Sequence, residues 1–286
     1  MTMQSLYDVP APAKLNLFLH ITGQREDGYH LIQSVFMLID WCDTLHFERR
    51  NDGLVTRADS LADGDPALPT DDLTVRAARA LQAACGTLFG ANIRLEKRIP
   101  AQAGMGGGSS DAASCLVALQ RLWGVKLPRD KLMEIALSLG ADVPFFLCGG
   151  NAWVEGVGDK ITPISLPAAD FVVVKPPQGL ETKAIFSSRS LKRDSETATI
   201  EGFSRQSRDH FFDFGRNDLQ PVASQLCADV GRSLDWLASN NLMGRMTGSG
   251  SAVFAQLEQD AILSNVPRNW RVRKCSGLQA HPLAGW

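Results

Sequence analysis

A dense run of glycines in the middle of the chain is the strongest chemical signal in the sequence. Four glycines fall within five positions, at 104, 106, 107 and 108, and Ser109-Ser110 follow them directly. Glycine lets a backbone pass close to a ligand, and a helix that begins there presents unpaired N–H groups with a partial positive charge. A single glycine would indicate only a tight turn, whereas this cluster predicts a cradle for phosphate groups.

The spacing excludes the better-known phosphate-binding loops. A P-loop needs Gly-Lys-Ser/Thr at the start of its helix, and the corresponding residues here are Gly108-Ser109-Ser110. A dinucleotide fingerprint needs G-x-G-x-x-G, which the glycine spacing does not fit, and the H-R-D triplet of protein kinases does not occur. Because the loop has no lysine of its own, positive charge must come from another part of the chain.

A lysine near the N-terminus and an aspartate in the middle of the chain are the candidate catalytic groups. Apolar residues at 15, 17, 19 and 21 alternate with other types, which predicts a strand with Lys14 and Asn16 on the same face. Asp142 stands between Ala141 and Val143-Pro-Phe-Phe, an apolar setting in which a carboxylate needs a partner. Taken alone, a solvated strand lysine and a helix-end aspartate would be the ordinary interpretations.

Two further segments have the residues of tight turns. Tyr29 and His30 follow Asp27-Gly28, a pair that by itself predicts a hairpin turn. The second glycine cluster, at 248–250, is likewise typical of a hairpin turn. The remaining histidines show no metal-ligand spacing.

Composition and charge fit a globular chain and narrow its partners. The 286 residues are 44% hydrophobic and 21% charged, a size that suits two lobes with a boundary near 160–170. A formal net charge of −2 gives no electrostatic reason to expect nucleic acid or an anionic membrane as a partner. Six scattered cysteines without a C-x-x-C pair indicate reduced thiols. No leader peptide or membrane-length apolar stretch is found, so we expect a cytoplasmic protein.

The periodicity of apolar residues and the positions of helix-capping and turn residues predict mixed α and β structure in both halves, and hence an α+β fold. Strands are predicted at 15–21, 33–40, 44–50, 91–99, 153–159, 161–166, 171–175, 243–247, 252–257 and 270–275. Helices are predicted at 73–85, from the two serines to Gly124, at 130–139 and at 221–240. Thr70 or Asp71 is expected to cap the first helix, and Ser109 or Ser110 the second. Residues 51–71 and 187–210 are expected to be mostly loop.

Three segments together resemble the motifs of the GHMP kinases, a family that includes galactokinase, homoserine kinase and mevalonate kinase. They are PAPAKLNLFLHI near the N-terminus, PAQAGMGGGSSDAA in the middle and MTGSGSAVFA near the C-terminus. Within the family, the chain is most similar to members that act on 4-diphosphocytidyl-2-C-methyl-D-erythritol. This likeness rests on DGYH at Asp27–His30, GADVPFF at Gly140–Phe146 and NDLQP at Asn217–Pro221. Met105 stands where leucine is common, a change of little volume.

The resemblance implies a two-lobed fold with the active site in the cleft between the lobes. Residues 1–165 would form a ribosomal-S5-like N-terminal domain that binds ATP, and residues 166–286 a ferredoxin-like C-terminal domain. The implied reaction is ATP-dependent phosphorylation of the 2-hydroxyl of that cytidine diphosphate-linked substrate, in the non-mevalonate route to isoprenoid precursors. Mg²⁺ is expected with ATP, with Ser110 as a candidate ligand. A monomer or weak homodimer is expected.

The same resemblance implies roles for individual residues. Asp142 would be the catalytic base and Lys14 would keep it ionised and stabilise transferred charge. A mechanism without a true base, in which both residues act by positioning and electrostatics, fits the sequence equally well. The implied ATP-binding residues are Pro100, Ala101, Gln102, Ala103, Gly104, Met105, Gly106, Gly107, Gly108, Ser109 and Ser110. The implied substrate-binding residues are Asn16, Tyr29, His30, Phe36, Phe186, Gly248 and Ser249.

Two other functions fit parts of the sequence. A GHMP kinase could take a different alcohol, such as homoserine or mevalonate. Such small acyclic acids have no use for the stacked base pocket expected between Tyr29 and Phe186. A nucleotide-binding regulator with this fold and no turnover is the third alternative, and the presence of Lys14 and Asp142 argues against it.

Overall fold

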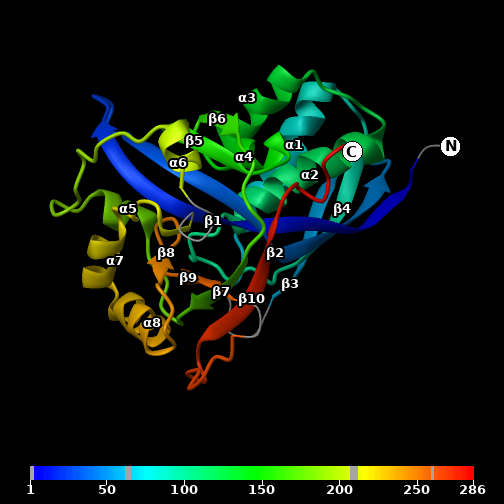
Figure 1. The fold of residues 1–286 in the computed structure, drawn as a ribbon. Helices are drawn as coiled ribbons and strands as arrows, with labels where there is room; N and C mark the ends of the chain where they lie inside the picture. Colours follow the sequence, from blue (N-terminus) through cyan, green and yellow to red (C-terminus); the bar gives the residue numbers. More distant parts are fainter. Residues whose placement is uncertain (1–2, 62–65, 207–211, 259–260) are drawn as a thin grey trace.

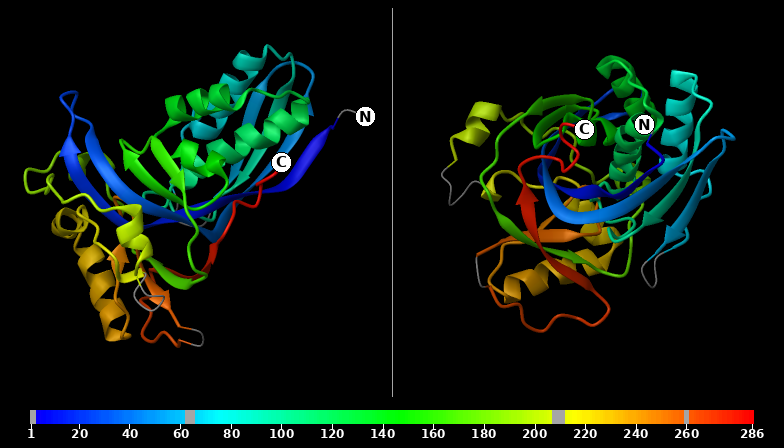
Figure 2. Two further views of the ribbon diagram at one scale, coloured as in Figure 1. Left: turned by 45° about the horizontal axis from the view of Figure 1, so that its top comes forward. Right: turned by 90° about the vertical axis from the view of Figure 1, so that its right-hand side faces the viewer.

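The fold is built around one very long hairpin. The computed structural model describes residues 3–61, 66–206, 212–258 and 261–286. Strand β1 (Ser5–Gln24) runs antiparallel to β2 (His30–Arg50), and this pair crosses the molecule (Figure 1). Helices α1 to α4 lie on one side of the hairpin and α7 and α8 on the other (Figures 1 and 2). The hairpin therefore separates two helical layers.

The remaining elements alternate between strands and helices along the chain. The strands are β3 (Val55–Ser60), β4 (Gly90–Glu96), β5 (Ala152–Gly156), β6 (Lys160–Pro163), β7 (Asp170–Lys175), β8 (Arg245–Met246), β9 (Val253–Leu257) and β10 (Arg271–Leu278). The helices are α1 (Leu73–Cys85), α2 (Gly107–Trp123), α3 (Arg129–Leu139), α4 (Val143–Cys148), α5 (Thr182–Phe186), α6 (Ile200–Ser204), α7 (Gln220–Leu226) and α8 (Ala228–Ser239). None of these helices is long and apolar enough to cross a membrane.

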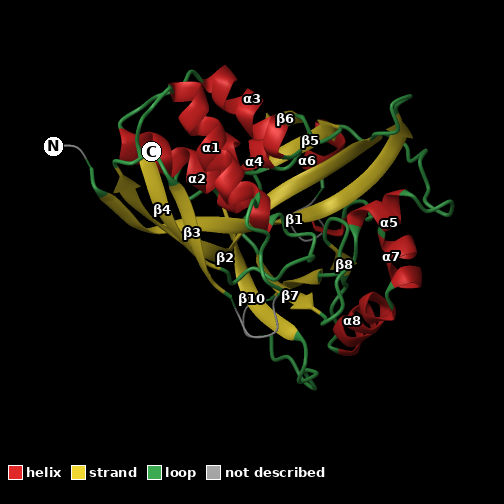
Figure 3. Ribbon diagram, turned by 180° about the vertical axis from the view of Figure 1, so that it is seen from behind, coloured by secondary structure: helices red, strands yellow, loops and turns green. Residues whose placement is uncertain are grey.

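In the described residues one mixed sheet joins the two halves of the chain. Its main path runs β3-β4-β2-β10-β7-β9-β8, with β1 paired to β2 and with β5 paired to β2 and β6. Strand β10 is the link, because its last residues pair with β2 and the rest of it pairs with β7. Seen from behind, the sheet runs beneath the helices α1 to α4 and continues toward α7 and α8 (Figure 3). The predicted α+β class is confirmed.

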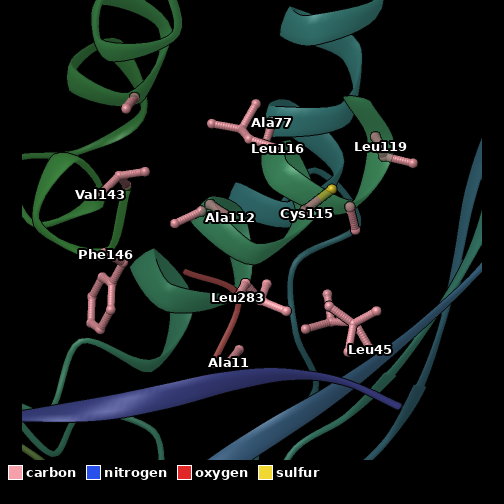
Figure 4. Close-up of a cluster of buried hydrophobic side chains, with 14 of the residues drawn as sticks. Ala11, Leu45, Ala77, Ala112, Cys115, Leu116, Leu119, Val143, Phe146 and Leu283 are labelled. Atoms are coloured by element: carbon pink, nitrogen blue, oxygen red, sulfur yellow. The ribbon is translucent and has the colours of Figure 1, made fainter. Parts of the chain in front are cut away.

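The first core cluster lies between helices α1 to α4 and the strands β1, β2 and β4. Apolar side chains at helical spacing in α1 and α2 face this cluster, which is why those segments form amphipathic helices. Figure 4 shows Ala77, Leu116 and Val143 from three of the helices around it. Leu283, from the segment after β10, packs into the same cluster. Two further clusters fill the space between the hairpin and β7 and β9, and between that sheet and α7 and α8.

The middle of β1 is buried on both faces, because helices cover one face and the C-terminal half covers the other. Residues 11–21 are all buried, including the polar Lys14 and Asn16. The predicted sharing of a face is confirmed, since the Lys14 ammonium donates a hydrogen bond to Asn16 Oδ1. An interior lysine and amide at the centre of the hairpin are therefore fixed in place rather than solvated.

Three strand and loop predictions were wrong. The strands predicted at 33–40 and 44–50 form one strand, β2, because a bulge absorbs the change of register opposite Pro12 and Ala13. The predicted loop at 51–71 contains β3, a short edge strand that pairs in parallel with β4. Its Arg57 is buried through ion pairs with Asp59 and Asp72, so it lacks the apolar alternation that marks a strand.

Several helix predictions also need correction. The helix predicted at 221–240 is two helices, α7 and α8, because the backbone is extended at Cys227. Helix α1 is capped by Asp72, whose Oδ1 accepts a hydrogen bond from the Val75 N–H at 3.1 Å, rather than by Thr70 or Asp71. The apolar run 143–148, to which no element was assigned from the sequence, is the short helix α4. Within 187–210, residues 200–204 form α6, and 207–210 lie outside the described residues.

Candidate active site

A cavity of about 1500 Å³ runs past the glycine-rich loop and receives side chains from both halves of the chain. It is bordered by β1, the loop before α2, the segment before α4, helix α5 and the loop at 248–250. Every residue that the sequence assigned to the site lines this cavity except Ser110. Ser110 is fully buried within α2, and its Oγ has no hydrogen-bond partner among the described residues.

The glycine loop ends in an open helix N-terminus. Gly106 occupies the N-cap position of α2 with a left-handed φ of 70°, and no side chain caps the helix. The first bond of the helix runs from the Ser110 N–H to the Gly106 carbonyl at 2.9 Å. The N–H groups of residues 107–109 therefore have no acceptor within the helix and remain for a ligand. The predicted serine caps were wrong, because the left-handed glycine turns the chain into the helix before the serines.

Close packing explains why Gly106 carries no side chain. A Cβ on Gly106 would lie 3.0 Å from Phe146 Cζ and 3.3 Å from Lys14 Cε. The Lys14 N–H also donates to the Met105 carbonyl at 3.0 Å. The start of helix α2 is thereby held directly against the strand that carries the lysine.

The two glycine clusters interlock backbone to backbone. Gly104 has a φ of 73°, and a Cβ there would lie 2.2 Å from the Thr247 carbonyl oxygen. Gly248 has a φ of 53°, and a Cβ there would lie 2.6 Å from the Gly104 carbonyl oxygen. Backbone bonds from residues 251 and 252 to the carbonyls of residues 102 and 103 continue the contact. The loop at 248–250 thus packs directly on the glycine loop.

Lys14 and Asp142 lie next to each other in the wall of the cavity. Lys14 Nζ lies 3.6 Å from Asp142 Oδ2 and 4.6 Å from the centre of the Phe36 ring. The Lys14 side chain is 4% exposed and the Asp142 side chain 33% exposed, because Asp142 occupies the N-cap position of α4. Burial lowers the pKa of Lys14, and the Asp142 carboxylate opposes that shift. The pair combines a desolvated cation with a carboxylate that a ligand can reach.

Asn16 is fixed beside Lys14 by contacts from both halves of the chain. Its N–H donates to Thr247 Oγ1 at 2.9 Å, and its Nδ2 donates to Ser34 Oγ at 3.0 Å. With the side-chain oxygen receiving Lys14 Nζ, the amide has little freedom to turn. A hydroxyl group bound between Lys14, Asn16 and Asp142 would therefore meet groups of fixed direction.

The aromatic end of the cavity differs in detail from the sequence-based expectation. Tyr29 lies in the turn of the β1–β2 hairpin and is 65% exposed. The ring that contacts Phe186 is that of His30, with ring centres 4.9 Å apart. Phe36 is almost fully buried, and its ring packs edge-on against Phe145 at 5.1 Å. Tyr29, His30 and Phe186, which we call the aromatic end, all line the cavity.

Lys97, which no sequence pattern singled out, lies behind the glycine loop. Its Nζ donates to Asp111 Oδ2 at 2.7 Å and also to Asp43 Oδ2, and all three side chains are buried. Burial alone would lower the pKa of Lys97, but Asp111 and Asp43 outweigh it and raise that pKa. Burial raises the pKa of Asp111 well above its usual range. The only sequence signal was a lysine at a strand end, which is ordinarily solvated.

The NDLQP segment, which the sequence singled out, supports the loops and strands that form the site. Asn217 Nδ2 donates to the carbonyls of Met246 and Gly248 at 2.7 and 2.8 Å. Asp218 Oδ2 accepts from the Ile21 N–H at 2.8 Å. These bonds fix the 248–250 loop and tie β1 to the segment before α7.

The comparisons with known proteins agree with this arrangement. The family model for the GHMP kinases N terminal domain matches residues 72–150, and that for the GHMP kinases C terminal matches residues 199–272. A Polaromonas sp. (strain JS666) protein named 4-diphosphocytidyl-2-C-methyl-D-erythritol kinase is 69% identical, over 99% of this chain and 95% of its own length. The chain belongs to the GHMP kinases. The predicted family and two-part GHMP kinase fold are therefore confirmed.

Solved structures of other GHMP kinases share the fold. A crystal structure of 4-(cytidine 5'-diphospho)-2C-methyl-D-erythritol kinase is similar with a TM-score of 0.76 and 31% identity, over 96% of this chain and 98% of that one. A homoserine kinase from Cytophaga hutchinsonii reaches a TM-score of 0.72 at 16% identity, over 98% of this chain and 96% of that one. The second likeness shows the fold alone, so substrate choice has to be argued from the site.

Proposed function

We propose that this GHMP kinase transfers the terminal phosphoryl group of ATP to the 2-hydroxyl of 4-diphosphocytidyl-2-C-methyl-D-erythritol. This reaction belongs to the non-mevalonate route to isoprenoid precursors. The observation that carries the proposal is the identity of 58–69%, over 99% of the chain, with relatives that are named as that kinase. The cavity supports it, because one end suits phosphates, the middle suits a hydroxyl group and the far end suits a flat base.

The triphosphate of ATP would lie across the start of α2. The unpaired N–H groups of residues 107–109 and the positive end of the helix dipole favour phosphate oxygens there. Beyond the helix start the cavity is lined by Leu68, Pro69 and Leu73, which offer apolar surface for the nucleotide base, and by Arg76. Lys97 stands under Gly107, where a Cβ would lie 3.3 Å from its Nζ.

The acceptor hydroxyl would bind where Lys14, Asn16 and Asp142 converge. Asp142 would accept its proton, while the Lys14 ammonium would stabilise charge on the transferred phosphoryl group. Because Lys14 is desolvated, its charge acts in a region of low dielectric constant, where it has more effect than at the surface. A mechanism with positioning and electrostatics alone uses the same three residues, and the pH dependence of turnover in an Asp142 variant distinguishes the two.

The substrate's cytosine would occupy the aromatic end of the cavity. The ring of Tyr29 is exposed and available to stack on a base, and the His30–Phe186 pair supplies a polar edge beside a second flat face. Neither homoserine nor mevalonate carries an aromatic group that such a pocket would bind. The aromatic end therefore favours the cytidylated substrate over these alternatives.

Mg²⁺ would enter the site with ATP. Within the described residues no group of three His, Cys, Asp or Glu side chains is arranged to hold a metal ion. Mg²⁺ commonly keeps water and substrate phosphates as most of its ligands, so such a cluster is not required. When bound, the ion would neutralise charge on the phosphate groups. The candidate ligand Ser110 does not itself line the cavity, but both of its neighbours do, and its buried Oγ has no hydrogen-bond partner among the described residues, so it stays the proposed Mg²⁺ ligand.

The cytoplasmic location, the monomer or weak homodimer and the division at 165/166 stay proposals. All six cysteines are free thiols, which suits a reducing compartment. Strand β10 and the segment after it pack against the N-terminal half. A boundary at 165/166 therefore separates the chain into two sequence segments, but the sheet and the first core cluster contain residues from both.

Release of ADP in a coupled assay tests the proposed function. The purified chain is mixed with ATP and, in turn, with the cytidylated methylerythritol, mevalonate and homoserine. We expect turnover with the cytidylated substrate and none above background with the other two alcohols. Turnover with mevalonate or homoserine alone would show that the chain is a GHMP kinase of different specificity.

A further inference from the structure

Arg193 lies behind the aromatic end of the cavity, where it hydrogen-bonds the side chain of His30 and the backbone carbonyl of Phe186. Its Nε donates to His30 Nε2 at 3.0 Å. One terminal nitrogen donates to the carbonyls of Phe186 and Ser188 at 3.0 and 2.9 Å, and the other to the carbonyl of Leu191 at 3.0 Å. Arg193 itself does not line the cavity, so these bonds set the position of residues that do.

The contact with His30 determines where the imidazole carries its hydrogen. A guanidinium group offers donors and no acceptor, so His30 Nε2 must be the acceptor of this bond. A neutral His30 therefore carries its hydrogen on Nδ1. Burial and the Arg193 charge also lower the pKa of His30, which keeps the ring neutral. Nδ1 has no hydrogen-bond partner in the part of the chain that the structure describes, and His30 borders the cavity.

We infer that Arg193 is a positioning residue that holds His30 in the Nδ1–H form and so makes the site select cytosine over uracil. This inference rests on the proposed function, because it assumes that a pyrimidine binds at the aromatic end. N3 of cytosine is an acceptor, which an Nδ1–H donor satisfies. N3 of uracil carries a hydrogen, so the same donor would face a second donor and both would lose their bonds.

The energetic difference is large enough to matter for specificity. A buried donor without a partner costs free energy that corresponds to roughly 5-fold to 150-fold in binding. A site that hydrogen-bonds its ligand rejects an analogue without the matching group more strongly than an apolar pocket does. Without Arg193, the imidazole could place its hydrogen on Nε2 and present Nδ1 as an acceptor, which suits uracil. Loss of Arg193 should therefore weaken the preference for cytosine rather than only the activity.

The tautomer can be measured without any turnover. Two-dimensional ¹H–¹⁵N spectra can correlate the carbon-bound hydrogens of the imidazole with both ring nitrogens. The nitrogen chemical shifts then distinguish a protonated nitrogen from an unprotonated one. The signals of His30 are identified by their loss in the His30→Asn variant. At neutral pH we expect a protonated Nδ1 and an unprotonated Nε2, with an Nε2–H population gained in Arg193→Gln. An Nε2–H or doubly protonated His30 in the unaltered protein would overturn the inference.

Kinetics test the consequence for the base. For cytidylated and uridylated forms of the substrate, the ratio of kcat/KM values should fall about tenfold or more in Arg193→Gln. Arg189→Gln is the matched control, because Arg189 is an exposed arginine of the same segment and should leave the ratio unchanged. An equal loss with both substrates would instead assign Arg193 a purely structural role through its bonds to Phe186 and Ser188.

A double variant separates the tautomer from the support of the loop. The amide of Asn has no tautomers, so in a His30→Asn background the further change Arg193→Gln should alter the substrate ratio less than about twofold. An undiminished tenfold effect in that background would overturn the inference. If the unaltered protein turns over neither pyrimidine substrate while His30 is still Nδ1–H, the proposed function fails and the tautomer assignment does not.

Discussion

Replacement of Lys97 by methionine should destabilise the protein strongly, because it removes the ammonium group that two buried aspartate side chains share. Lys97 Nζ lies 2.7 Å from Asp111 Oδ2 and donates to Asp43 as well. Methionine keeps most of the side-chain volume, so packing changes little. The variant therefore isolates the loss of charge.

The magnitude follows from the geometry. Asp43 is the carboxylate whose charge Lys97 balances, because Asp111 has a raised pKa and holds a proton over part of the pH range, and the desolvation of the buried groups offsets part of the attraction. Removing one member of a buried ion pair costs about 3–5 kcal/mol. For a chain of this size, that corresponds to a decrease in Tm of roughly 6–20 °C.

The two aspartates should respond differently to replacement by asparagine. Asp43 Oδ1 accepts the N–H groups of Arg98 and Ile99, so Asp43→Asn should destabilise the protein. The pKa of Asp111 is raised in the folded state. At a pH above the ordinary pKa of an aspartate, the folded state therefore still holds a proton that the unfolded state has released. The contribution of Asp111 to stability therefore falls as the pH rises from about 4 toward the folded pKa. Asp111→Asn should lack this decrease, and its stability relative to the unaltered protein should improve over that range.

Thermal and urea unfolding, followed by tryptophan fluorescence and circular dichroism, measure these changes. A Lys97→Met variant within about 1 kcal/mol of the unaltered protein would refute the reasoning, since that is far below the cost of an uncompensated buried charge. So would an Asp111→Asn variant that loses as much stability as Asp43→Asn and shows the same pH dependence as the unaltered protein.

Three further predictions concern the cavity and the first core. Asp142→Asn should lower kcat by about 10²-fold to 10⁴-fold while ATP still binds, as measured by ADP release and calorimetry. The alkaline limit of its residual kcat/KM should move to lower pH, because the pKa of Lys14, already lowered by burial, loses the carboxylate that raises it. Gly104→Ala should weaken ATP binding and lower Tm more than Gly86→Ala, because both have positive φ but only Gly104 meets backbone within 3 Å. Leu283→Ala should cost about 2–5 kcal/mol in urea unfolding, as for a buried core leucine.

Each of these has an outcome that contradicts it. Near-normal kcat in Asp142→Asn would make Asp142 structural. Equal Tm values for Gly104→Ala and Gly86→Ala would mean that the contact between the two glycine loops is not rigid. A change below about 0.5 kcal/mol for Leu283→Ala would mean that the segment after β10 adds little to the core.

Local patterns predicted the site well where the chemistry depends on short sequence segments. The glycine loop, Lys14 beside Asn16, and helices α1 and α3 follow from spacing, because a period and a run of glycines are readable within a few residues. Lys97 was not predictable, since its role depends on Asp43 and Asp111 from distant parts of the chain. For the same reason the contact of Phe186 with His30, and the bond of Arg193 to His30, emerge only when α5 and its following loop fold onto the hairpin.

The place of Leu283 affects the order in which the protein can fold as it is synthesised. Helices α1 to α4 and the hairpin leave the ribosome long before β10 and Leu283, yet the core between them includes Leu283 and their sheet continues into β10. The His281 N–H donates to the Gly149 carbonyl at 2.9 Å, which closes the end of α4. Until β10 and Leu283 have been synthesised, the N-terminal half therefore has an unpaired sheet edge and an incomplete core. Nascent chains in such a state are prone to aggregate. Completion of the first half of this kinase is thus a late event that coincides with completion of the second.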